Sequence, residues 1–203
     1  NGLAIFTQYG KLLLLLVGTM LFMALVINPI IIFIYLRCNP YPLVFRCLRE
    51  SGLTAFFTRS SAANIPVNMA MCEKLGLDKD FYSVSIPLGA TINMDGTAIY
   101  QCVATVFLAT CAGMQLTLSQ MILIVVTATL ASIGTAGVPG AGLIMLAMVL
   151  QSVNLPMEGL ALVAGIDRVL DMFRTCLNIT GDGAVAIVMD QAEKKYAKRQ
   201  AAA

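Results

Sequence analysis

One apolar segment, residues 165–190, carries five polar side chains at helical spacing. Asp167, Asp171, Arg174, Asn178 and Asp182 follow one another at intervals of 4, 3, 4 and 4 residues. At about 100° per residue, these steps keep all five within a stripe roughly 80° wide on one helix face. A charged group at membrane depth is costly unless it faces a bundle interior or a water-filled cavity. The stripe is therefore predicted to bind something charged.

Two residues of this stripe suggest what is bound. Arg174 offers a planar fork that suits a carboxylate. Asp171 lies three residues earlier on the same face and could take an ammonium group. Together they describe a pocket for a zwitterion with an extra acid group. The alternative is an internal salt-bridge ladder, but buried ion pairs cost more than apolar packing unless something uses them.

A second polar group interrupts the apolar segment 81–111 at Asn93-Met94-Asp95-Gly96-Thr97. Unwound backbone carbonyls beside Asn and Asp oxygens suit a hard cation such as Na+, and Asn178 and Asp182 offer the same chemistry. The alternative is a plain helix kink, since Gly, Asn and Asp all weaken a helix. A kink alone does not explain an aspartate in the middle of an apolar span.

The composition indicates a membrane protein. The chain is 59% hydrophobic and 12% charged, whereas a soluble domain is about 25% charged. A net charge of +2 is too small to indicate nucleic-acid binding. The six cysteines are scattered and there is no histidine, which argues against a zinc site or a disulfide framework. Because the chain begins at Asn1 without a signal-peptide pattern, we expect it to be part of a longer protein.

The chain divides into unbroken and broken apolar segments. We interpret residues 1–50 as a membrane-spanning helix (10–36) with a polar junction, 51–190 as the core, and 191–203 as a charged cytoplasmic tail. The core contains two broken segments that resemble re-entrant helical hairpins, 51–71 with its break at 64–66 and 120–150 with its break at 132–142, and two spans, 81–111 and 160–189.

Charge placement favours this layout. If both broken segments are hairpins, most basic residues lie on one side of the membrane and Lys11 lies on the other. The positive-inside rule makes the side with most basic residues cytoplasmic. The residues on that side are Arg37, Arg46, Arg49, Lys74, Lys79, Lys194, Lys195, Lys198 and Arg199. A hairpin followed by a polar-broken span occurs twice, in opposite orientations. Inverted repeats with discontinuous helices are typical of secondary transporters.

Four stretches resemble the dicarboxylate/amino acid:cation symporter family, the sodium-coupled glutamate transporter homologues. They are Thr58–Ser61, Pro87–Thr97, Ala131–Gly142 and Asp171–Asp182, and the resemblance covers the chain from about Gly10 onward. It implies an all-α membrane protein with two re-entrant hairpins in inverted repeat. The pieces would be the sixth, seventh and eighth transmembrane helices and the two hairpins. The first five helices and their trimerisation scaffold would be absent.

The resemblance also implies site residues. Asp171 would take the substrate's amino group, and Arg174 with Thr97 a side-chain carboxylate. Further residues would hold the main-chain carboxylate or line and close the pocket: Ser61, Asn178, Thr175, Val138 and Gly142. One Na+ would be held by Gly89, Asn93, Asn178 and Asp182. A second would use backbone oxygens of Thr91, Ser132, Ile133 and Thr135, and a third the Asn93-Met94-Asp95 motif plus absent residues.

The predicted function is sodium-coupled symport of aspartate or glutamate by an elevator-type mechanism, without enzymatic activity. Arg174 favours an acidic substrate and Asp171 an amino acid, whereas residues 60–66 resemble the serine/threonine branch. The alternatives within the family are symport of serine and threonine or of C4-dicarboxylates. Those from other classes are a channel and an intramembrane aspartyl protease, with a catalytic pair drawn from Asp95, Asp167, Asp171 and Asp182. We expect a multi-pass protein of the cell inner (plasma) membrane, a homotrimer when complete.

Overall fold

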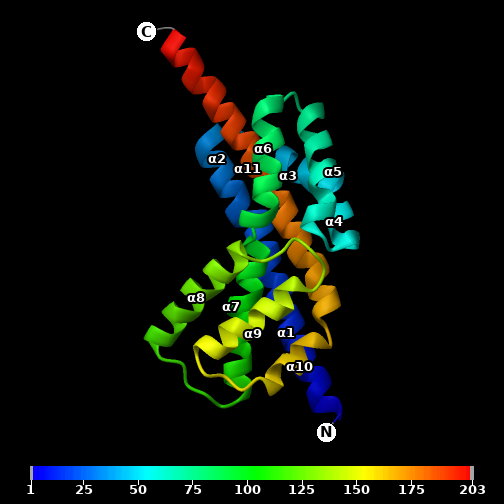
Figure 1. Ribbon diagram of the computed structural model, residues 1–203, viewed down its shortest axis with the longest axis vertical. Helices are drawn as coiled ribbons and strands as arrows, with labels where there is room; N and C mark the ends of the chain where they lie inside the picture. Colours follow the sequence, from blue (N-terminus) through cyan, green and yellow to red (C-terminus); the bar gives the residue numbers. More distant parts are fainter. Residues whose placement is uncertain (1, 202–203) are drawn as a thin grey trace.

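The computed structural model describes residues 2–201, and this part of the chain is helical without strands (Figure 1). The elements are α1 (Gly2–Phe22), η1 (Met23–Ile27), α2 (Asn28–Leu36), α3 (Tyr41–Cys47), η2 (Leu48–Gly52), α4 (Leu53–Thr58), α5 (Ser61–Lys74), α6 (Lys79–Ile92), α7 (Asp95–Cys111), α8 (Leu118–Ile133), α9 (Ala141–Ser152), α10 (Glu158–Ala164) and α11 (Asp167–Ala201). The two η elements are π-helical turns. The all-α class predicted from the sequence is confirmed.

The N-terminal elements α1, η1 and α2 form one continuous helical rod. Within the described residues, Thr7–Leu36 is the one helix long and apolar enough to cross a membrane by length and composition. The π turn η1 comes just before Pro29, whose missing N–H cannot bond the carbonyl of Leu25. The hydroxyl of Tyr41 donates to that carbonyl at 3.4 Å instead. The predicted span 10–36 therefore corresponds to a real helix, which ends where Arg37 adopts a left-handed conformation.

The first broken segment breaks earlier than predicted. The prediction at residues 64–66 is wrong, because the helix ends at Arg59, in a left-handed conformation with φ of 54°, and restarts after Ser60. Ser60 caps α5 by accepting a hydrogen bond from the Ala63 N–H at 3.1 Å. Pro66 lies inside α5, where it removes one backbone hydrogen bond without ending the helix. The left-handed Arg59 ends α4 and the capping Ser60 starts α5, whereas a proline in the second turn of α5 leaves that helix intact.

The other two predicted breaks occur where the sequence indicates them. The chain leaves helical geometry at Asn93 and Met94, between α6 and α7. It does so again between α8 and α9, where Gly140 has a φ of 80°. Figure 1 shows both breaks and the Arg59–Ser60 tip at about the same height, midway along the molecule. Three irregular segments therefore meet around the middle of α11.

The predicted last span, 160–189, is divided differently. It begins as the short helix α10 and restarts as α11, which continues without interruption into the predicted tail. A Cβ on Gly165 would lie 2.8 Å from the hydroxyl of Tyr9, so glycine allows the chain to turn close to α1. The charged residues after position 190 extend the helix, since Glu and Lys are good helix formers. The last two residues of the predicted tail, and the side chains of Lys198 and Arg199, lie outside the described part of the chain.

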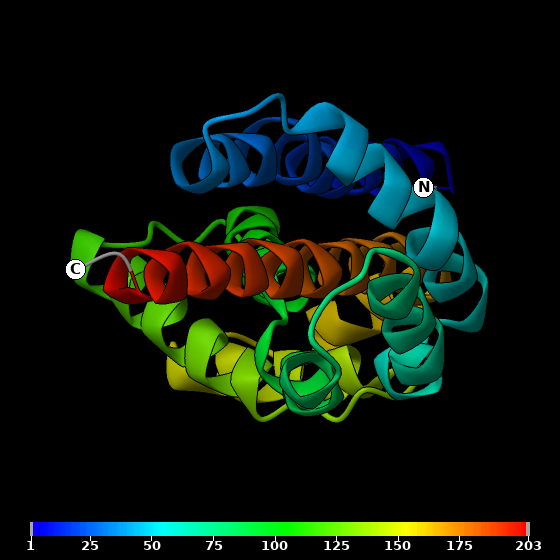
Figure 2. The same ribbon diagram turned by 90° about the horizontal axis from the view of Figure 1, so that it is seen from above.

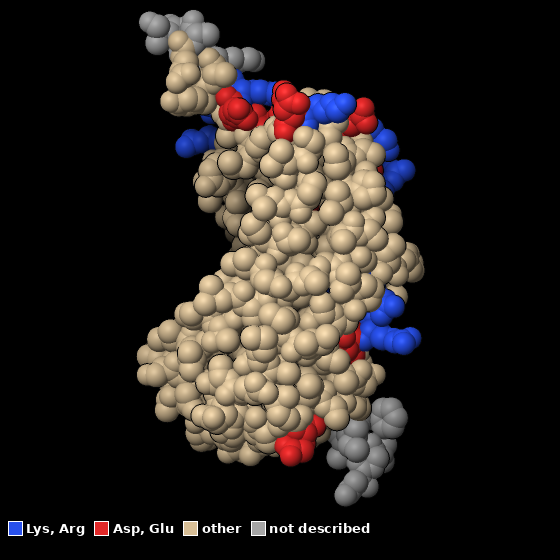
Figure 3. Space-filling model, in the orientation of Figure 1, with Lys and Arg blue, Asp and Glu red and all other residues tan. Residues whose placement is uncertain are grey.

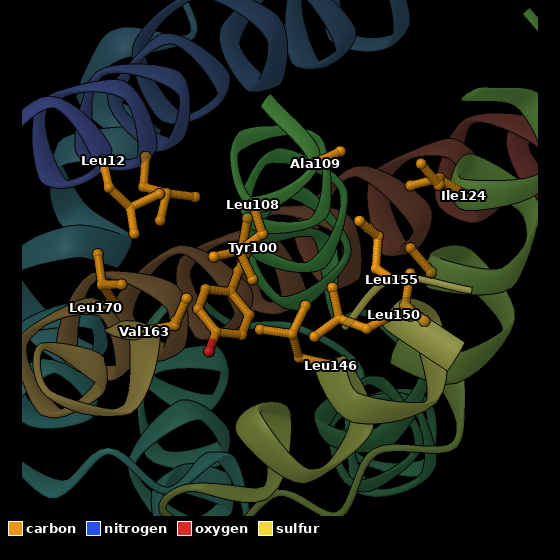
Figure 4. Close-up of a cluster of buried hydrophobic side chains, with 14 of the residues drawn as sticks. Leu12, Tyr100, Leu108, Ala109, Ile124, Leu146, Leu150, Leu155, Val163 and Leu170 are labelled. Atoms are coloured by element: carbon orange, nitrogen blue, oxygen red, sulfur yellow. The ribbon is translucent and has the colours of Figure 1, made fainter. Parts of the chain in front are cut away.

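α11 is the central element of the fold. Seen from above, it runs lengthwise between the α1–α2 rod and the α8–α9 pair (Figure 2). The largest apolar core joins α1, α7, α9 and α11 (Figure 4). Its fully buried members include Leu12, Tyr100, Leu146, Leu150 and Leu170. This packing places the polar stripe of α11 inside the bundle.

The outer surface separates apolar from charged regions. On the face shown in Figure 3, charged side chains gather mainly at the end that carries the C-terminus, and most of the remaining face is uncharged apart from small groups at its right edge and lower end. The outer face of α8 is apolar and exposed, including Leu118, Ile122 and Leu130. An exposed apolar surface beside a charged end is typical of a membrane protein.

Candidate functional site

All eight residues predicted to bind a substrate line one small cavity in the middle of the molecule. They come from α5 (Ser61), α7 (Thr97), the α8–α9 loop and α9 (Val138, Gly142), and α11 (Asp171, Arg174, Thr175, Asn178). Met94 and Thr135, both predicted cation-site residues, line it as well. The cavity holds about 10 Å³, which is roughly the space of a single water. This space is far too small for an amino acid, so binding needs the pocket to open further.

The guanidinium of Arg174 lines the pocket beside Gly142. Its Nη2 donates to Asp171 Oδ1 at 2.6 Å and its Nη1 to Asp167 Oδ1 at 3.5 Å, and all three side chains are buried. The guanidinium carbon lies 4.3 Å from the centre of the Tyr100 ring, close enough for a cation–π interaction. The positive charge of Arg174 is thus already compensated by two carboxylates. The predicted substrate set omitted Asp167, although its position in the stripe indicated it.

The second oxygen of Asp171 contacts the α8–α9 loop. Asp171 Oδ2 accepts a hydrogen bond from the backbone N–H of Gly140 at 3.0 Å. Two residues later, a Cβ on Gly142 would lie 2.7 Å from Arg174 Cζ. Glycine at this position therefore lets the start of α9 rest directly against the guanidinium. The loop closes the pocket by touching the two residues that are expected to bind the substrate.

Two tips, the turn between α4 and α5 and the α8–α9 loop, also contact each other. The carbonyl oxygen of Gly137 accepts hydrogen bonds from Ser60 Oγ at 2.8 Å and from the Ala62 N–H at 3.0 Å. A Cβ on Gly137 would lie 3.0 Å from the Ala62 nitrogen and 3.1 Å from Ser61 Cβ. The backbone of the α8–α9 loop thus lies tightly against the start of α5. The pocket is closed between these two tips.

Asn178 supports the break between α6 and α7. Its Oδ1 accepts from the Gly96 N–H at 2.7 Å, and its Nδ2 donates to Thr97 Oγ1 at 3.1 Å. The residue that precedes α7, Met94, makes no side-chain capping bond, so Asn178 acts as the cap from another helix. A Cβ on Gly96 would lie 2.6 Å from the carbonyl oxygen of Arg174. The start of α7 is therefore tightly packed against α11.

A second polar cluster lies one turn further along α11. A Cβ on Gly89 would collide with Asp182 Oδ1, so α6 passes directly over this carboxylate. With its amide nitrogen facing Asp95, Asn93 donates to Asp95 Oδ1 at 2.5 Å and accepts from the Asp182 N–H at 2.6 Å. Asn68, which was not predicted, donates to Asp182 Oδ2 at 3.2 Å. The structure therefore brings Gly89, Asn93, Asp95 and Asp182 together.

The donor set of this cluster suits a hard cation. No group of three or more His, Cys, Asp or Glu side chains that could hold a metal ion occurs among the described residues. A cation here would depend on carboxylate, amide and backbone oxygens, which sodium accepts and zinc does not favour. The carboxylates of Asp95 and Asp182 and the amide of Asn93 are oxygen donors of this kind, so the donor set fits such a group.

The residues predicted to form the second sodium site are less clearly grouped in the structure than those of the first. Ser132 and Thr135 are buried, and their hydroxyls donate to carbonyls of α8, those of Thr129 at 2.8 Å and Ala131 at 2.7 Å. Thr91 and Ile133 are exposed. Whether their backbone oxygens share one cation stays a prediction.

Comparison with known proteins identifies related chains. Residues 1–192 match the family described as "Sodium:dicarboxylate symporter family". The chain is 54% identical over 188 residues to the "Serine/threonine transporter SstT" of Bifidobacterium adolescentis, covering 90% of this chain and 43% of that protein. A protein of the same name from Streptococcus agalactiae is 49% identical over 90% of this chain and 46% of its own length. The chain thus spans less than half the length of these curated relatives.

Proposed function

This chain belongs to the sodium:dicarboxylate symporter family, and from that premise we propose that it is part of the transport domain of a sodium-coupled serine/threonine symporter. The observation that carries the proposal is the convergence of the eight pocket residues from α5, α7, α9, the α8–α9 loop and α11 on one buried cavity. Family members are transporters, so this chain is a membrane protein. We also propose that the complete protein lies in the inner membrane, crosses it several times and forms a trimer.

The substrate we propose differs from the acidic amino acids favoured by the sequence analysis. Relatives that are about half identical to this chain are named serine/threonine transporters. In addition, Arg174 is paired with Asp167 and Asp171 in this structure. Serine and threonine carry an ammonium group, a carboxylate and a hydroxyl, but no second carboxylate that would need a free guanidinium. Arg174 remains the one feature that favours aspartate, so the test includes aspartate.

We assign the substrate groups as follows. The ammonium group binds Asp171, the main-chain carboxylate binds near Ser61 and Asn178, and the short side chain lies toward Thr97 and Thr175. Since Asp171 already accepts from the Gly140 N–H, binding requires the α8–α9 loop to move away from α11 and close again. In this proposal the α4–α5 and α8–α9 pairs are the two re-entrant hairpins of an inverted repeat. The elevator movement depends on segments outside this chain.

Sodium coupling follows from electrostatics in this proposal. Asp182 is buried and Asp95 is partly buried in the same cluster, where Asn93 contacts both residues, and like charges in such a site are unfavourable. Bound Na+ supplies the compensating charge at the cluster of Gly89, Asn93 and Asp182. Because Asn93 bonds Asp95, the first residue of α7, and Asn178 bonds the Gly96 N–H in the same turn, an ordered cation site favours an ordered substrate site. The two sites would then strengthen each other's affinity.

No specific observation favours the protease or the channel, the alternative functions from other classes. An aspartyl protease needs two carboxylates that share a proton. Asp167 and Asp171 instead share the guanidinium of Arg174, and Asn93 bonds both Asp95 Oδ1 and the Asp182 N–H. A channel needs an open path, whereas the cavity at the centre of this molecule has room for about one water. Symport is the function that uses the buried ionic groups.

The test measures the thermal stability of the complete protein with L-serine, L-threonine or L-aspartate, in sodium and in potassium. A ligand at about 100 times its Kd should add roughly 2.7 kcal/mol to the free energy of unfolding. We expect stabilisation by serine and threonine in sodium alone. Stabilisation by aspartate alone would restore the acidic assignment, and no response to any amino acid would contradict symport.

Two variants of α7 localise the effect. Thr97→Val removes a pocket hydroxyl, which accepts a hydrogen bond from Asn178. Thr110→Val removes an exposed hydroxyl that bonds only its own helix at Val106. Substrate affinity should fall in the first variant and stay unchanged in the second.

A further inference from the structure

Asn68 is an amide buried beneath the second polar cluster. It lies on α5, seven residues after Ser61 and thus on the same helix face, and none of its surface is exposed. Its Nδ2 donates to Asp182 Oδ2 at 3.2 Å and to the Ile179 carbonyl at 3.3 Å. Because both neighbours are acceptors, they fix the amide orientation, and the reverse orientation would place an oxygen against both. The amide nitrogen therefore always faces Asp182.

The oxygen of the Asn68 amide shows that packing alone does not explain why an asparagine stands at this position. Asn68 Oδ1 is buried and has no hydrogen-bond partner among the described residues. A buried acceptor without a partner costs free energy. The cost is tolerable only if the two hydrogen bonds made by the nitrogen are needed. Leucine is close in size and would fill the same space without leaving an orphaned oxygen.

The geometry around Asp182 indicates what those bonds achieve. Oδ2 is held by Asn68 from α5, while Oδ1 faces Gly89 on α6, where a Cβ would collide with it. Asn68 thus holds one oxygen of the carboxylate, while the other lies directly against Gly89 of α6, within the second polar cluster. An arginine or lysine at position 68 would neutralise the carboxylate, whereas an amide orients it and leaves its charge available.

We propose that Asn68 is a positioning residue for the cation site: by orienting Asp182, it sets the affinity for sodium without contacting the substrate. This inference rests on the proposed function, since it concerns the same cation. Asn68 does not line the substrate cavity. Its loss should therefore change sodium binding much more than substrate binding in saturating sodium.

The experiment titrates the complete protein with NaCl, at constant ionic strength, and follows its thermal midpoint without substrate. A hydrogen bond to a charged group is strong enough that its loss corresponds to about a tenfold change in affinity. We expect Asn68→Leu to raise the half-saturating sodium concentration about tenfold. The Kd for serine, measured in saturating sodium, should stay near that of the wild type.

Asn64 provides the matched control. It is also a fully buried asparagine of α5, but its Nδ2 donates to Thr58 Oγ1 and to the Ser60 carbonyl, away from Asp182. Asn64→Leu should leave the sodium titration unchanged. Equal shifts in both variants would show a general role of α5 in stability and overturn the proposal. So would an unchanged titration in Asn68→Leu.

A second substitution covers failure of Asn68→Leu to fold. Asn68→Thr keeps a hydroxyl donor near Asp182 and should show an intermediate sodium affinity. Wild-type affinity in Asn68→Thr together with an unfolded Asn68→Leu would overturn the proposal in favour of a structural role. If the wild type itself shows no response to sodium, the proposed function fails and this inference fails with it. A wild-type response that Asn68 variants do not alter overturns this inference alone.

Discussion

Ser60 Oγ donates a hydrogen bond to the carbonyl oxygen of Gly137 at 2.8 Å, although the two residues are 77 positions apart in the sequence. The same hydroxyl accepts from the Ala63 N–H and so caps α5. The Ser60 side chain thus caps the helix that follows the first break, and it also contacts the α8–α9 loop at the third break. Closure of the pocket and formation of the α5 start are linked through this hydroxyl.

Ser60→Ala should weaken both functions of that hydroxyl. Loss of a helix cap costs about 1 kcal/mol of stability, and loss of the bond to Gly137 loosens the α8–α9 loop, so serine should bind more weakly. Calorimetry and thermal unfolding would measure both effects. Thr117→Ala is the control, because it removes the capping box of α8 at the far end of that helix. It should reduce stability similarly and leave substrate binding intact, and equal losses of binding would refute the link.

Arg174→Ala should be strongly destabilising even without substrate. It leaves Asp167 and Asp171 buried without their shared cation, and breaking a buried ion pair costs about 3–5 kcal/mol. Adding Asp167→Asn removes one of the orphaned charges and should recover part of the loss. A double-mutant cycle on unfolding free energies checks this. Simple additivity of the two substitutions would contradict the proposed pairing.

Gly89→Ala should abolish sodium-dependent stabilisation. The new methyl group would occupy the position of Asp182 Oδ1, so the carboxylate must turn away from the cation site. Gly18→Ala is the matched control, since a Cβ there meets nothing within 4 Å. That variant should be neutral or slightly more stable, because alanine favours a helix by up to about 1 kcal/mol over glycine. A normal sodium response in Gly89→Ala would remove this glycine from the site.

Gly96→Ala should reduce both stability and substrate affinity. A methyl group there would lie 2.6 Å from the backbone oxygen of Arg174, which cannot move without shifting α11. The start of α7 would separate from Asn178, the side chain that caps it. Gly134→Ala, whose Cβ would meet nothing closer than 3.9 Å, should change neither property. Thermal unfolding and serine binding of the two variants decide the matter.

Glu50 predicts a pH dependence outside the membrane-spanning segments. Its hydrogen bond from Arg46, at 3.0 Å, lowers the pKa of the Glu50 carboxyl below its ordinary value of 4.5, and Lys74 adds to this. Ionised Glu50 therefore favours the folded state above the unfolded-state pKa, and this contribution disappears as pH falls through the lowered folded-state pKa. The stability difference between wild type and Glu50→Gln should be small and constant near neutral pH, and should vanish once the pH has fallen through the lowered folded-state pKa. Arg46→Gln should remove most of this dependence, and a difference that grows in acid would contradict the sign.

Local patterns were sufficient for much of the fold and for the site's composition. The spacing of Asp171, Arg174 and Asn178 placed them on one face of α11, because helical periodicity is a property of the backbone alone. The breaks at Asn93–Met94 and before Gly140 follow from residues that weaken a helix wherever they occur. Apolar run length predicted the rod that ends at Leu36, since the hydrophobic effect acts on composition.

Contacts between distant segments needed the tertiary structure. Sequence reasoning placed the first break at residues 64–66, but the cap and partners of Ser60 decided its position. Sequence reasoning predicted that Arg174 binds the substrate, whereas in the structure Arg174 also pairs with Asp167. It omitted Asn68, because an asparagine in α5 means little until packing brings it to Asp182. A sequence determines which groups lie on one helix face, and only the packing of helices determines which of those groups meet.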